Sequence, residues 1–196
     1  MPDGVAIRPA DKPPRDPRRL SVRPFGLRAN RPAGWRVALA CTMGNVRGRD
    51  KKTKTFLGAV SEMKLRKYQP DDYDNIIELF YDTVHSINTA DYTKIQLNAW
   101  APKDKALFKL ESRLLNNYAV VVEKDGIIVG FGNVNGTGYF DCLYTHKDYQ
   151  GIGVATLIAN DIERYFYQEG VQVITTDASI TAKPFFEKRG YVVLQE

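Results

Sequence analysis

The residues best suited to chemistry lie at a glycine turn that joins a strand pattern to a helix pattern. Residues 139–145 are aromatic, β-branched and apolar enough for a strand, while apolar residues recur at helical spacing over residues 154–167. Gly151 and Gly153 stand between them. The first backbone N–H groups of a helix lack partners and carry the positive end of its dipole, so they bind anions. Because glycine lets a phosphate approach the backbone, the pattern predicts a pyrophosphate site or, alternatively, a tight turn in an ordinary α/β domain.

Two segments resemble recurring segments of the GNAT superfamily of N-acetyltransferases. The first is Gln150-x-x-Gly153-x-Ala155, which is similar to the family signature Gln/Arg-x-x-Gly-x-Gly/Ala. The second, at residues 182–191, resembles a short helix that ends in Glu-Lys-x-Gly-aromatic. The resemblance covers residues 63–196 and is to bacterial members of unassigned substrate. It implies an α/β fold of the α+β type, in which helices flank a mixed, mostly antiparallel sheet.

The resemblance implies acetyl-CoA as cosubstrate and no metal. The N–H groups of residues 151–156 would hold the pyrophosphate, and the Gln150 side chain could add a donor. The backbone N–H groups of Leu143 and Thr145 would face the cofactor, while Ser179 replaces an asparagine that often binds the pantetheine. The predicted cofactor-binding residues are Leu143, Tyr144, Thr145, Gln150, Gly151, Ile152, Gly153, Val154, Ala155, Thr156 and Ser179.

Transfer to an amine also needs a group that removes a proton. Strand alternation predicts one face with Tyr139, Asp141, Leu143 and Thr145 and another with Cys142, Tyr144 and His146. If the first face lines the cleft, Asp141 is the expected general base, directly or through a water, with Tyr139 in support. The alternative for Asp141 is a carboxylate hydrogen-bonded at the sheet surface. His146 is expected to pack beside the helix.

Many members of the family carry a tyrosine just before the Glu-Lys-x-Gly run, where it protonates the departing CoA thiolate. Phe186 stands at that position and cannot donate a proton. We therefore expect Tyr144, Ser179 or water to serve, or no acid at all, because a thiolate is a tolerable leaving group near neutral pH. The predicted catalytic residues are Asp141, Tyr139 and Tyr144.

The elements that must position these residues follow in order from Met63. The sequence predicts strands at 63–68, 118–123, 127–131, 139–145, 171–176 and 191–194, and helices after Pro70, at 91–102, at 104–115, at 154–167 and from Pro184. In the family, the two helices after the first strand border the acceptor cleft. By resemblance this places Trp100, Tyr92 and His85 near the cleft, and capping of the core is the alternative for Trp100.

The resemblance implies one more strand after the one that starts at Gly190, inserted between its neighbours in the sheet. The sequence stops at Glu196, so we expect the final strand to be missing. A clipped chain, a disrupted reading frame, or strand addition by a partner such as a second copy in a homodimer would each account for this.

Residues 1–62 differ in composition from the rest of the chain. They hold 14 of the 28 Lys and Arg, 5 of the 23 Asp and Glu, and 7 of the 10 prolines, which makes them +9 and residues 63–196 −4. Such a segment has little apolar surface to offset the entropy of ordering. We therefore expect a disordered basic leader at 1–62 and a GNAT domain at 63–196. The natural chain is expected to begin at or near Met63, with the leader an upstream extension of the reading frame.

Composition gives little support to other function classes. The leader could contact nucleic acid or anionic lipid through its arginines, but no folded nucleic-acid motif accompanies them. No run approaches the ~20 apolar residues of a membrane span, and residues 37–41 are too short for a secretory core. Cys41 and Cys142 form neither a disulfide framework nor a metal site. We expect a cytoplasmic protein without a membrane partner.

Together these patterns predict transfer of an acetyl group from acetyl-CoA to a primary amine of a small molecule or protein, by direct attack in a ternary complex. The charge of residues 63–196 is compatible with a cationic acceptor such as a lysine or polyamine. The alternative is a non-catalytic acetyl-CoA-binding regulatory module, which Phe186 and the absent strand would fit. A nucleic-acid binder that acts through the leader is the third hypothesis.

Overall fold

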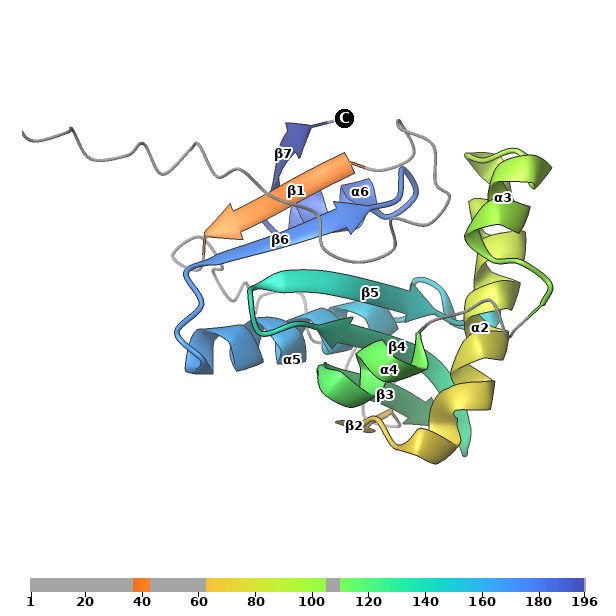
Figure 1. The fold of residues 1–196 in the computed structure, drawn as a ribbon, viewed down its shortest axis with the longest axis horizontal. Helices are drawn as coiled ribbons and strands as arrows, with labels where there is room; N and C mark the ends of the chain where they lie inside the picture. Colours follow the sequence, from red (N-terminus) through yellow and green to blue (C-terminus); the bar gives the residue numbers. More distant parts are fainter. Residues whose placement is uncertain (1–36, 43–62, 105–109, 196) are drawn as a thin grey trace, which may run out of the picture.

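A single seven-stranded sheet organises the protein, whose computed structural model describes residues 37–42, 63–104 and 110–195 (Figure 1). In sheet order the strands are β2 (Lys64–Lys67), β3 (Tyr118–Lys124), β4 (Ile127–Val134), β5 (Tyr139–Thr145), β6 (Val173–Ala178), β1 (Val37–Thr42) and β7 (Val192–Gln195). The β5–β6 pair is parallel, and the other pairs are antiparallel. The predicted α/β fold with a mixed, mostly antiparallel sheet is confirmed.

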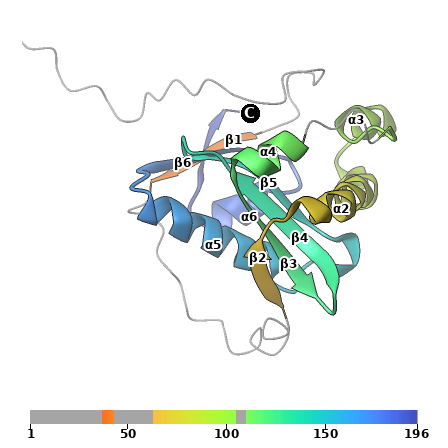
Figure 2. The same cartoon turned by 60° about the horizontal axis from the view of Figure 1, so that its bottom comes forward.

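Helices cover both faces of the central strands (Figure 2). The helices are α2 (Tyr73–Ser86), α3 (Lys94–Trp100), α4 (Glu111–Asn116), α5 (Val154–Gln168) and α6 (Lys183–Lys188), with single 3₁₀ turns η2 (Pro70–Asp72), η3 (Asn88–Ala90) and η5 (Lys147–Tyr149). On one face α5 buries Ile158 and Ile162 in a core that includes Val120 of β3. On the other face α2 buries Ile76 in a core that includes Val121. Strand β3 thus sends neighbouring side chains to opposite cores, as strand geometry requires.

The predicted order of elements from Met63 is confirmed, with shifts at their ends. Pro70 lies in the first turn before α2, and Gly170 and Gly190, with φ of 72° and 92°, follow α5 and α6. Both glycines adopt the left-handed conformation that commonly ends helices. The helix predicted at 104–115 is shorter, because α4 covers Glu111–Asn116 and residues 105–109 lie outside the described residues.

Two glycines on β4 set the position of α5. A Cβ atom at Gly130 would lie 2.4 Å from Val154 Cγ1, and one at Gly132 would lie 2.6 Å from Ile158 Cγ2. Real side chains do not tolerate such distances, so α5 rests directly on the backbone of β4. This close approach fixes the start of α5, which follows the glycine turn, relative to the end of β5.

Part of the predicted leader belongs to the sheet, which corrects the expectation that all of residues 1–62 lie outside the fold. Strand β1 pairs antiparallel with β6, with Leu39 opposite Thr176 and Cys41 opposite Ile174. Leu39 is 0% exposed and Cys41 is 2% exposed in the core beneath α5. Two alternate side chains of this six-residue strand, Leu39 and Cys41, are apolar and enter the core. This is sufficient for a short strand to complete a sheet that is already formed. The rest of the predicted leader lies outside the described residues.

Strand β1 also changes the interpretation of the missing final strand. Its other edge pairs with β7, with Leu39 opposite Val193 and Ala40 opposite Val192. In the described part of the chain, β7 pairs with no other strand. The place between β6 and β7 is therefore filled by residues 37–42 of the same chain, which was not among the explanations that the sequence suggested.

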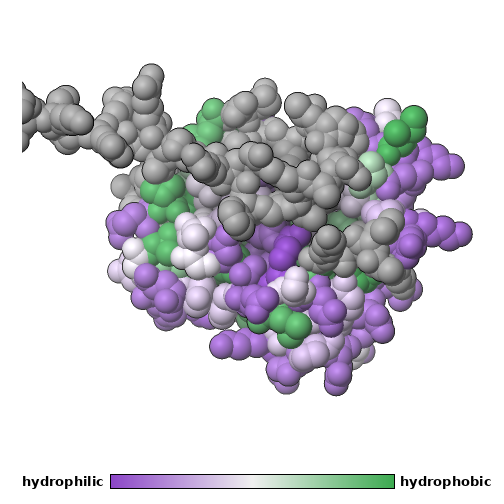
Figure 3. Space-filling view, in the orientation of Figure 1, coloured by the Kyte–Doolittle hydropathy of each residue, from purple (hydrophilic) through white to green (hydrophobic). Residues whose placement is uncertain are grey.

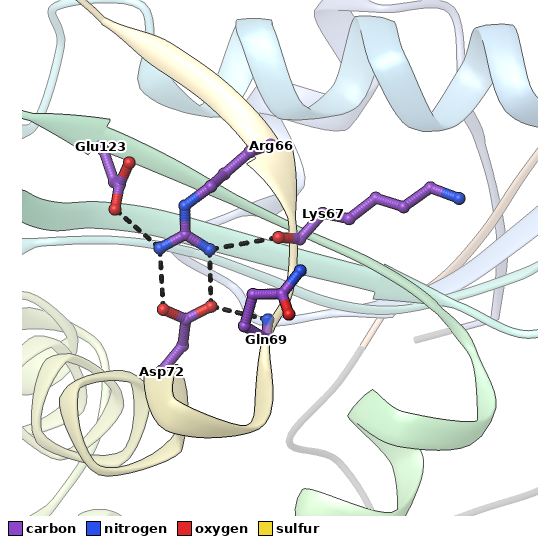
Figure 4. Close-up of polar contacts among 5 residues, drawn as sticks. All are labelled: Arg66, Lys67, Gln69, Asp72 and Glu123. Carbon is purple, nitrogen blue, oxygen red and sulfur yellow. Dashed lines mark hydrogen bonds and ion pairs between the residues drawn. The ribbon is translucent and has the colours of Figure 1, made fainter.

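A charge cluster joins β2 to the start of α2 and to β3 (Figure 4). Arg66 Nη1 lies 2.7 Å from Asp72 Oδ2, and Arg66 Nη2 lies 2.6 Å from Glu123 Oε1. Asp72 also accepts a 2.7 Å hydrogen bond from the backbone N–H of Gln69. The hydrogen bond from Arg66 holds the pKa of the Asp72 carboxyl below its ordinary value, although burial opposes this. The cluster fixes the entry of the chain into α2.

The face of the molecule in Figure 3 is mainly hydrophilic where its residues are described, and its apolar groups form separate patches. Large exposed apolar side chains come from different elements, such as Ile95 of α3 and Tyr167 of α5. Within the described residues, no helix combines the length and the apolar character that crossing a bilayer requires.

Candidate active site

The glycine turn has the conformation that an anion site requires. Gly151 and Gly153 have φ of 74° and 101°, and Gly153 is the residue that caps the start of α5. No side chain caps this end of the helix, and the first helical hydrogen bond runs from the Leu157 N–H to the Gly153 carbonyl at 2.9 Å. A Cβ atom at Gly151 would meet nothing within 4 Å. The space at Gly151 is therefore open, and the first N–H groups of α5 carry the positive end of the helix dipole.

Gln150 supports this turn from within. Its side-chain Nε2 donates to the Thr145 carbonyl at 2.7 Å and to the His146 carbonyl at 3.3 Å. Sequence analysis expected the Gln150 amide to serve as a donor to the cofactor, but in this structure it connects the end of β5 to the turn. The Thr145 carbonyl also accepts from Thr83 Oγ1 of α2 at 3.0 Å.

Strands β5 and β6 separate just before the glycine turn. They pair only at Tyr139 with Thr175 and at Phe140 with Thr176, although both strands continue further. The opening between them leads toward the start of α5, which follows β5. In the described part of the chain, the strand edge that β5 leaves unpaired with β6 thus lies next to the glycine turn.

Backbone donors of β5 face this opening. The His146 N–H donates to the Val129 carbonyl of β4 at 2.9 Å. Because successive N–H groups of a strand point to opposite edges, the N–H of Tyr144 also faces β4, while those of Leu143 and Thr145 face the opening. Sequence analysis expected the N–H groups of Leu143 and Thr145 to face the cofactor, and this stays a prediction.

A β-bulge overturns the predicted alternation along β5. Asn133 pairs with Cys142 and Val134 pairs with Phe140, which leaves Asp141 as an extra residue. As a result Asp141 and Cys142 lie on the same side, where both contact Arg113 of α4. Leu143 packs against the core beneath α5, so Asp141 does not share its face as predicted.

Asp141 is engaged in a nearly buried ion pair. Arg113 Nε donates to Asp141 Oδ2 at 2.7 Å, Arg113 Nη2 makes a second contact with the same oxygen, and Asn133 Nδ2 lies 3.3 Å from it. The Asp141 side chain is 8% exposed. Burial lowers the pKa of the Arg113 guanidinium, but the electrostatic attraction of Cys142 and Asp141 raises it more. The pKa of Arg113 therefore lies above its ordinary value. The ion pair thus engages the carboxylate that sequence analysis selected as the general base.

The other predicted catalytic residues lie apart from one another. The Tyr144 ring packs between Phe80, at a centroid distance of 4.7 Å, and Phe131, at 5.3 Å, in the core beneath α2. The Tyr139 hydroxyl donates to Asp177 Oδ2 of β6 at 3.1 Å. The structure therefore joins Tyr139 to a carboxylate that sequence analysis did not select.

Residues near α6 have structural contacts. Phe186 is 2% exposed and packs edge to face against Phe140 and Tyr191. The Ser179 hydroxyl accepts from the Ala182 N–H at 3.0 Å and so helps to begin the turn that leads into α6. Phe186 thus belongs to the core.

The segment after α2 closes one side of the opening. The Tyr92 hydroxyl accepts from the Ile180 N–H at 2.8 Å, and Asn88 Nδ2 donates to Thr181 Oγ1 at 2.9 Å. Of the residues expected near an acceptor cleft, Tyr92 lies at this border. Trp100 packs edge to face on Tyr92 and against the core beneath α2, while His85 Nε2 lies 2.8 Å from the Ala101 carbonyl. Across the described residues, no group of three or more His, Cys, Asp or Glu side chains could hold a metal ion.

Three comparisons relate this arrangement to known proteins. A family model described as an acetyltransferase (GNAT) domain matches residues 88–196. The uncharacterized N-acetyltransferase YafP of Escherichia coli K12 is 28% identical over 70% of this chain and 86% of its own. A crystal structure of a GCN5-related N-acetyltransferase from Rhodopseudomonas palustris is 34% identical over 66% of this chain and 81% of its own, with a TM-score of 0.62. The PaiA N-acetyltransferase from Thermoplasma acidophilum, solved with coenzyme A, shares the fold at 14% identity and a TM-score of 0.57, over 64% of this chain and 87% of its own.

Proposed function

The chain belongs to the GNAT family of N-acetyltransferases, and from this premise we propose that it transfers an acetyl group from acetyl-CoA to a primary amine of a small molecule or peptide. The transfer would occur by direct attack of the amine on the thioester in a ternary complex. The observation that carries the proposal is the opening between β5 and β6, which leads to the uncapped start of α5. In the proposal, the start of α5 binds an anion and the unpaired part of β5 binds an extended chain beside it.

The diphosphate of acetyl-CoA fits the glycine turn. The N–H groups of residues 151–156 would bind it, because they lie at the positive end of α5 and Gly151 leaves open space beside them. The pantetheine arm is an extended chain with amide groups, which can hydrogen-bond a free strand edge. The N–H groups of Leu143 and Thr145 would serve as its donors, with Tyr144 between them and Ser179 just after β6.

The chemistry requires stabilisation of the negative charge that develops on the thioester oxygen. Backbone N–H groups held in a fixed orientation perform this task in many acyl transfers. The N–H of Leu143 is a suitable donor, since its direction is set by the hydrogen bonds of β5 to β4. The thiolate would leave without help from Phe186, because a thiolate is a tolerable leaving group near neutral pH.

A non-catalytic acetyl-CoA-binding module is the second candidate, and Phe186 favours it. This residue is buried and lacks the hydroxyl that the family often has at its position. A module of this kind would bind acetyl-CoA but would release no CoA in the presence of amines.

Calorimetry with acetyl-CoA and CoA, combined with an assay of thiol release, tests both candidates. We expect binding of acetyl-CoA and amine-dependent release of CoA with at least one member of a panel that contains spermidine, glucosamine and a lysine peptide. Binding without release on any acceptor would favour the module. Absence of heat with both nucleotides, from a folded sample, would refute the proposed site.

A further inference from the structure

Two side chains hold the open end of β5, where it no longer pairs with β6. Thr145 is the last residue of β5 and lies beyond the two positions at which the strands pair. It is 7% exposed, and its carbonyl accepts from Thr83 Oγ1 at 3.0 Å and from Gln150 Nε2 at 2.7 Å. A backbone carbonyl has two lone pairs, so these two donors fill its capacity.

The direction of the Thr145 carbonyl shows what the two side chains replace. The N–H of the same peptide group, that of His146, donates to the Val129 carbonyl of β4 at 2.9 Å. Because the two groups of a trans peptide point in opposite directions, the carbonyl points away from β4, toward the side where β6 runs. A buried carbonyl needs a donor, which in a continuous sheet is an N–H of the neighbouring strand. Thr83 and Gln150 supply the donors here, so the strands separate without leaving this carbonyl unsatisfied.

Thr83 reaches the strand end from α2. Its side chain is buried, with 5% of the residue exposed, on the helix that the family resemblance places beside the acceptor cleft. The peptide group between Thr145 and His146 is thus held from α2, from the glycine turn and from β4. A peptide group fixed at three points limits the rotation of the preceding one, which carries the Thr145 N–H.

The inference that follows rests on the proposed function, in which the Thr145 N–H binds the pantetheine arm. We propose that Thr83 is a positioning residue for this arm. Its hydroxyl takes the place of β6 on the Thr145 carbonyl and keeps the adjacent N–H directed into the opening. Gln150 contributes to the same arrangement, but it also donates to the His146 carbonyl, so its loss would disturb the glycine turn as well. Thr83 therefore gives the cleaner test.

The test compares CoA with its nucleotide part alone, adenosine 5′-diphosphate 3′-phosphate, which lacks the arm. The Kd of the nucleotide part divided by the Kd of CoA measures what the arm adds to the affinity, and calorimetry gives both values. Thr83→Val keeps the shape of the side chain and removes its hydroxyl. For this variant we expect the ratio to fall by about 2- to 12-fold, the range for one hydrogen bond. The Kd of the nucleotide part should not change, and Thr83→Ser, which restores the hydroxyl, should restore the ratio.

The strand offers a matched control at its closed end. Thr176 of β6 is 4% exposed, and its hydroxyl donates to the Phe140 carbonyl of β5 at 2.8 Å, where the two strands are paired. Thr176→Val thus removes the same kind of buried contact from the same strand. Both valine variants should lower the melting temperature, but only Thr83→Val should lower the ratio. If Thr83→Val does not fold, Thr83→Ala gives the same comparison with a smaller side chain.

The outcomes separate this inference from the proposed function. An unchanged ratio in Thr83→Val, an equal decrease in Thr176→Val, or no recovery in Thr83→Ser would overturn the role of Thr83 and leave the proposed transferase intact. A wild type that binds CoA no more tightly than the nucleotide part would also overturn it, because the arm would then add nothing. A wild type that binds neither CoA nor acetyl-CoA would refute the proposed function, and the role of Thr83 with it.

Discussion

The variant Gly151→Asp places a carboxylate in the proposed diphosphate site without a steric clash. A Cβ atom at Gly151 meets nothing within 4 Å, and Gly151 has φ of 74°. Gly126 in the β3–β4 turn has φ of 78° and an equally open position, so Gly126→Asp carries the same backbone strain and the same charge. The difference between the two variants isolates the effect of a negative charge at the start of α5.

The expected effect follows from Coulomb's law. At a separation of roughly 6 Å, two unit charges repel by ~0.7 kcal/mol in water and by ~2.8 kcal/mol at an effective dielectric constant of about 20. The glycine turn is open on one side, so an intermediate value of ~1.4 kcal/mol applies, which corresponds to about a tenfold loss of affinity. The new carboxylate would also compete for the N–H groups of α5, which increases the loss.

Calorimetry with acetyl-CoA at low and high salt measures this effect. We expect a Kd at least about tenfold higher for Gly151→Asp than for Gly126→Asp, with a smaller ratio at 1 M salt, where the screening length falls to ~3 Å. The melting temperature should fall less for Gly151→Asp, because a carboxylate at a helix start is favourable. Equal acetyl-CoA affinities of Gly151→Asp and Gly126→Asp would refute the proposed anion site at the start of α5.

Three further predictions concern the stability of the fold. Arg113→Met leaves the Asp141 carboxylate nearly buried without its guanidinium and should cost about 3 kcal/mol in urea unfolding, of which adding Asp141→Asn recovers part. The hydrogen bond from Arg66 lowers the pKa of Asp72 in the folded protein. The stability that this pair contributes is therefore present above the unfolded pKa of about 3.9 and is lost as the pH falls through the folded pKa. Arg66→Met should lower the free energy of unfolding at pH 7, and this free energy should then fall less on acidification than that of the wild type. Leu39→Ala should cost about 2–5 kcal/mol because Leu39 is fully buried, whereas a cost below about 0.5 kcal/mol would place β1 outside the sheet.

Features that depend on neighbours in the chain were predictable from the sequence. The turn at Gly151 and Gly153 follows from a strand pattern, two glycines and a helix pattern, all within a short stretch. The N–H groups of Leu143 and Thr145 were selected by the family resemblance, and the pairing of β5 with β4 sets their directions. These local signals also gave the family resemblance, since the motif consists of the same residues.

Features that depend on strand pairing were not predictable in the same way. The bulge at Asp141 exists because β4 and β5 pair with unequal spacing, and no residue type in β5 announces it. Strand β1 is a short apolar run in a basic segment, and its stabilisation comes from contacts with residues near the other end of the chain.

The position of β1 has a consequence for how the protein folds during synthesis. Residues 37–42 leave the ribosome before the other strands of the sheet, but their partners in β6 and β7 emerge only much later. Pairings so distant in sequence form slowly, because the entropy of closing a long loop must be overcome before any contact is gained. The strands β2 to β5 can assemble earlier through local hairpins, so the half of the sheet that contains β1 is expected to form only after β6 and β7 have been synthesised.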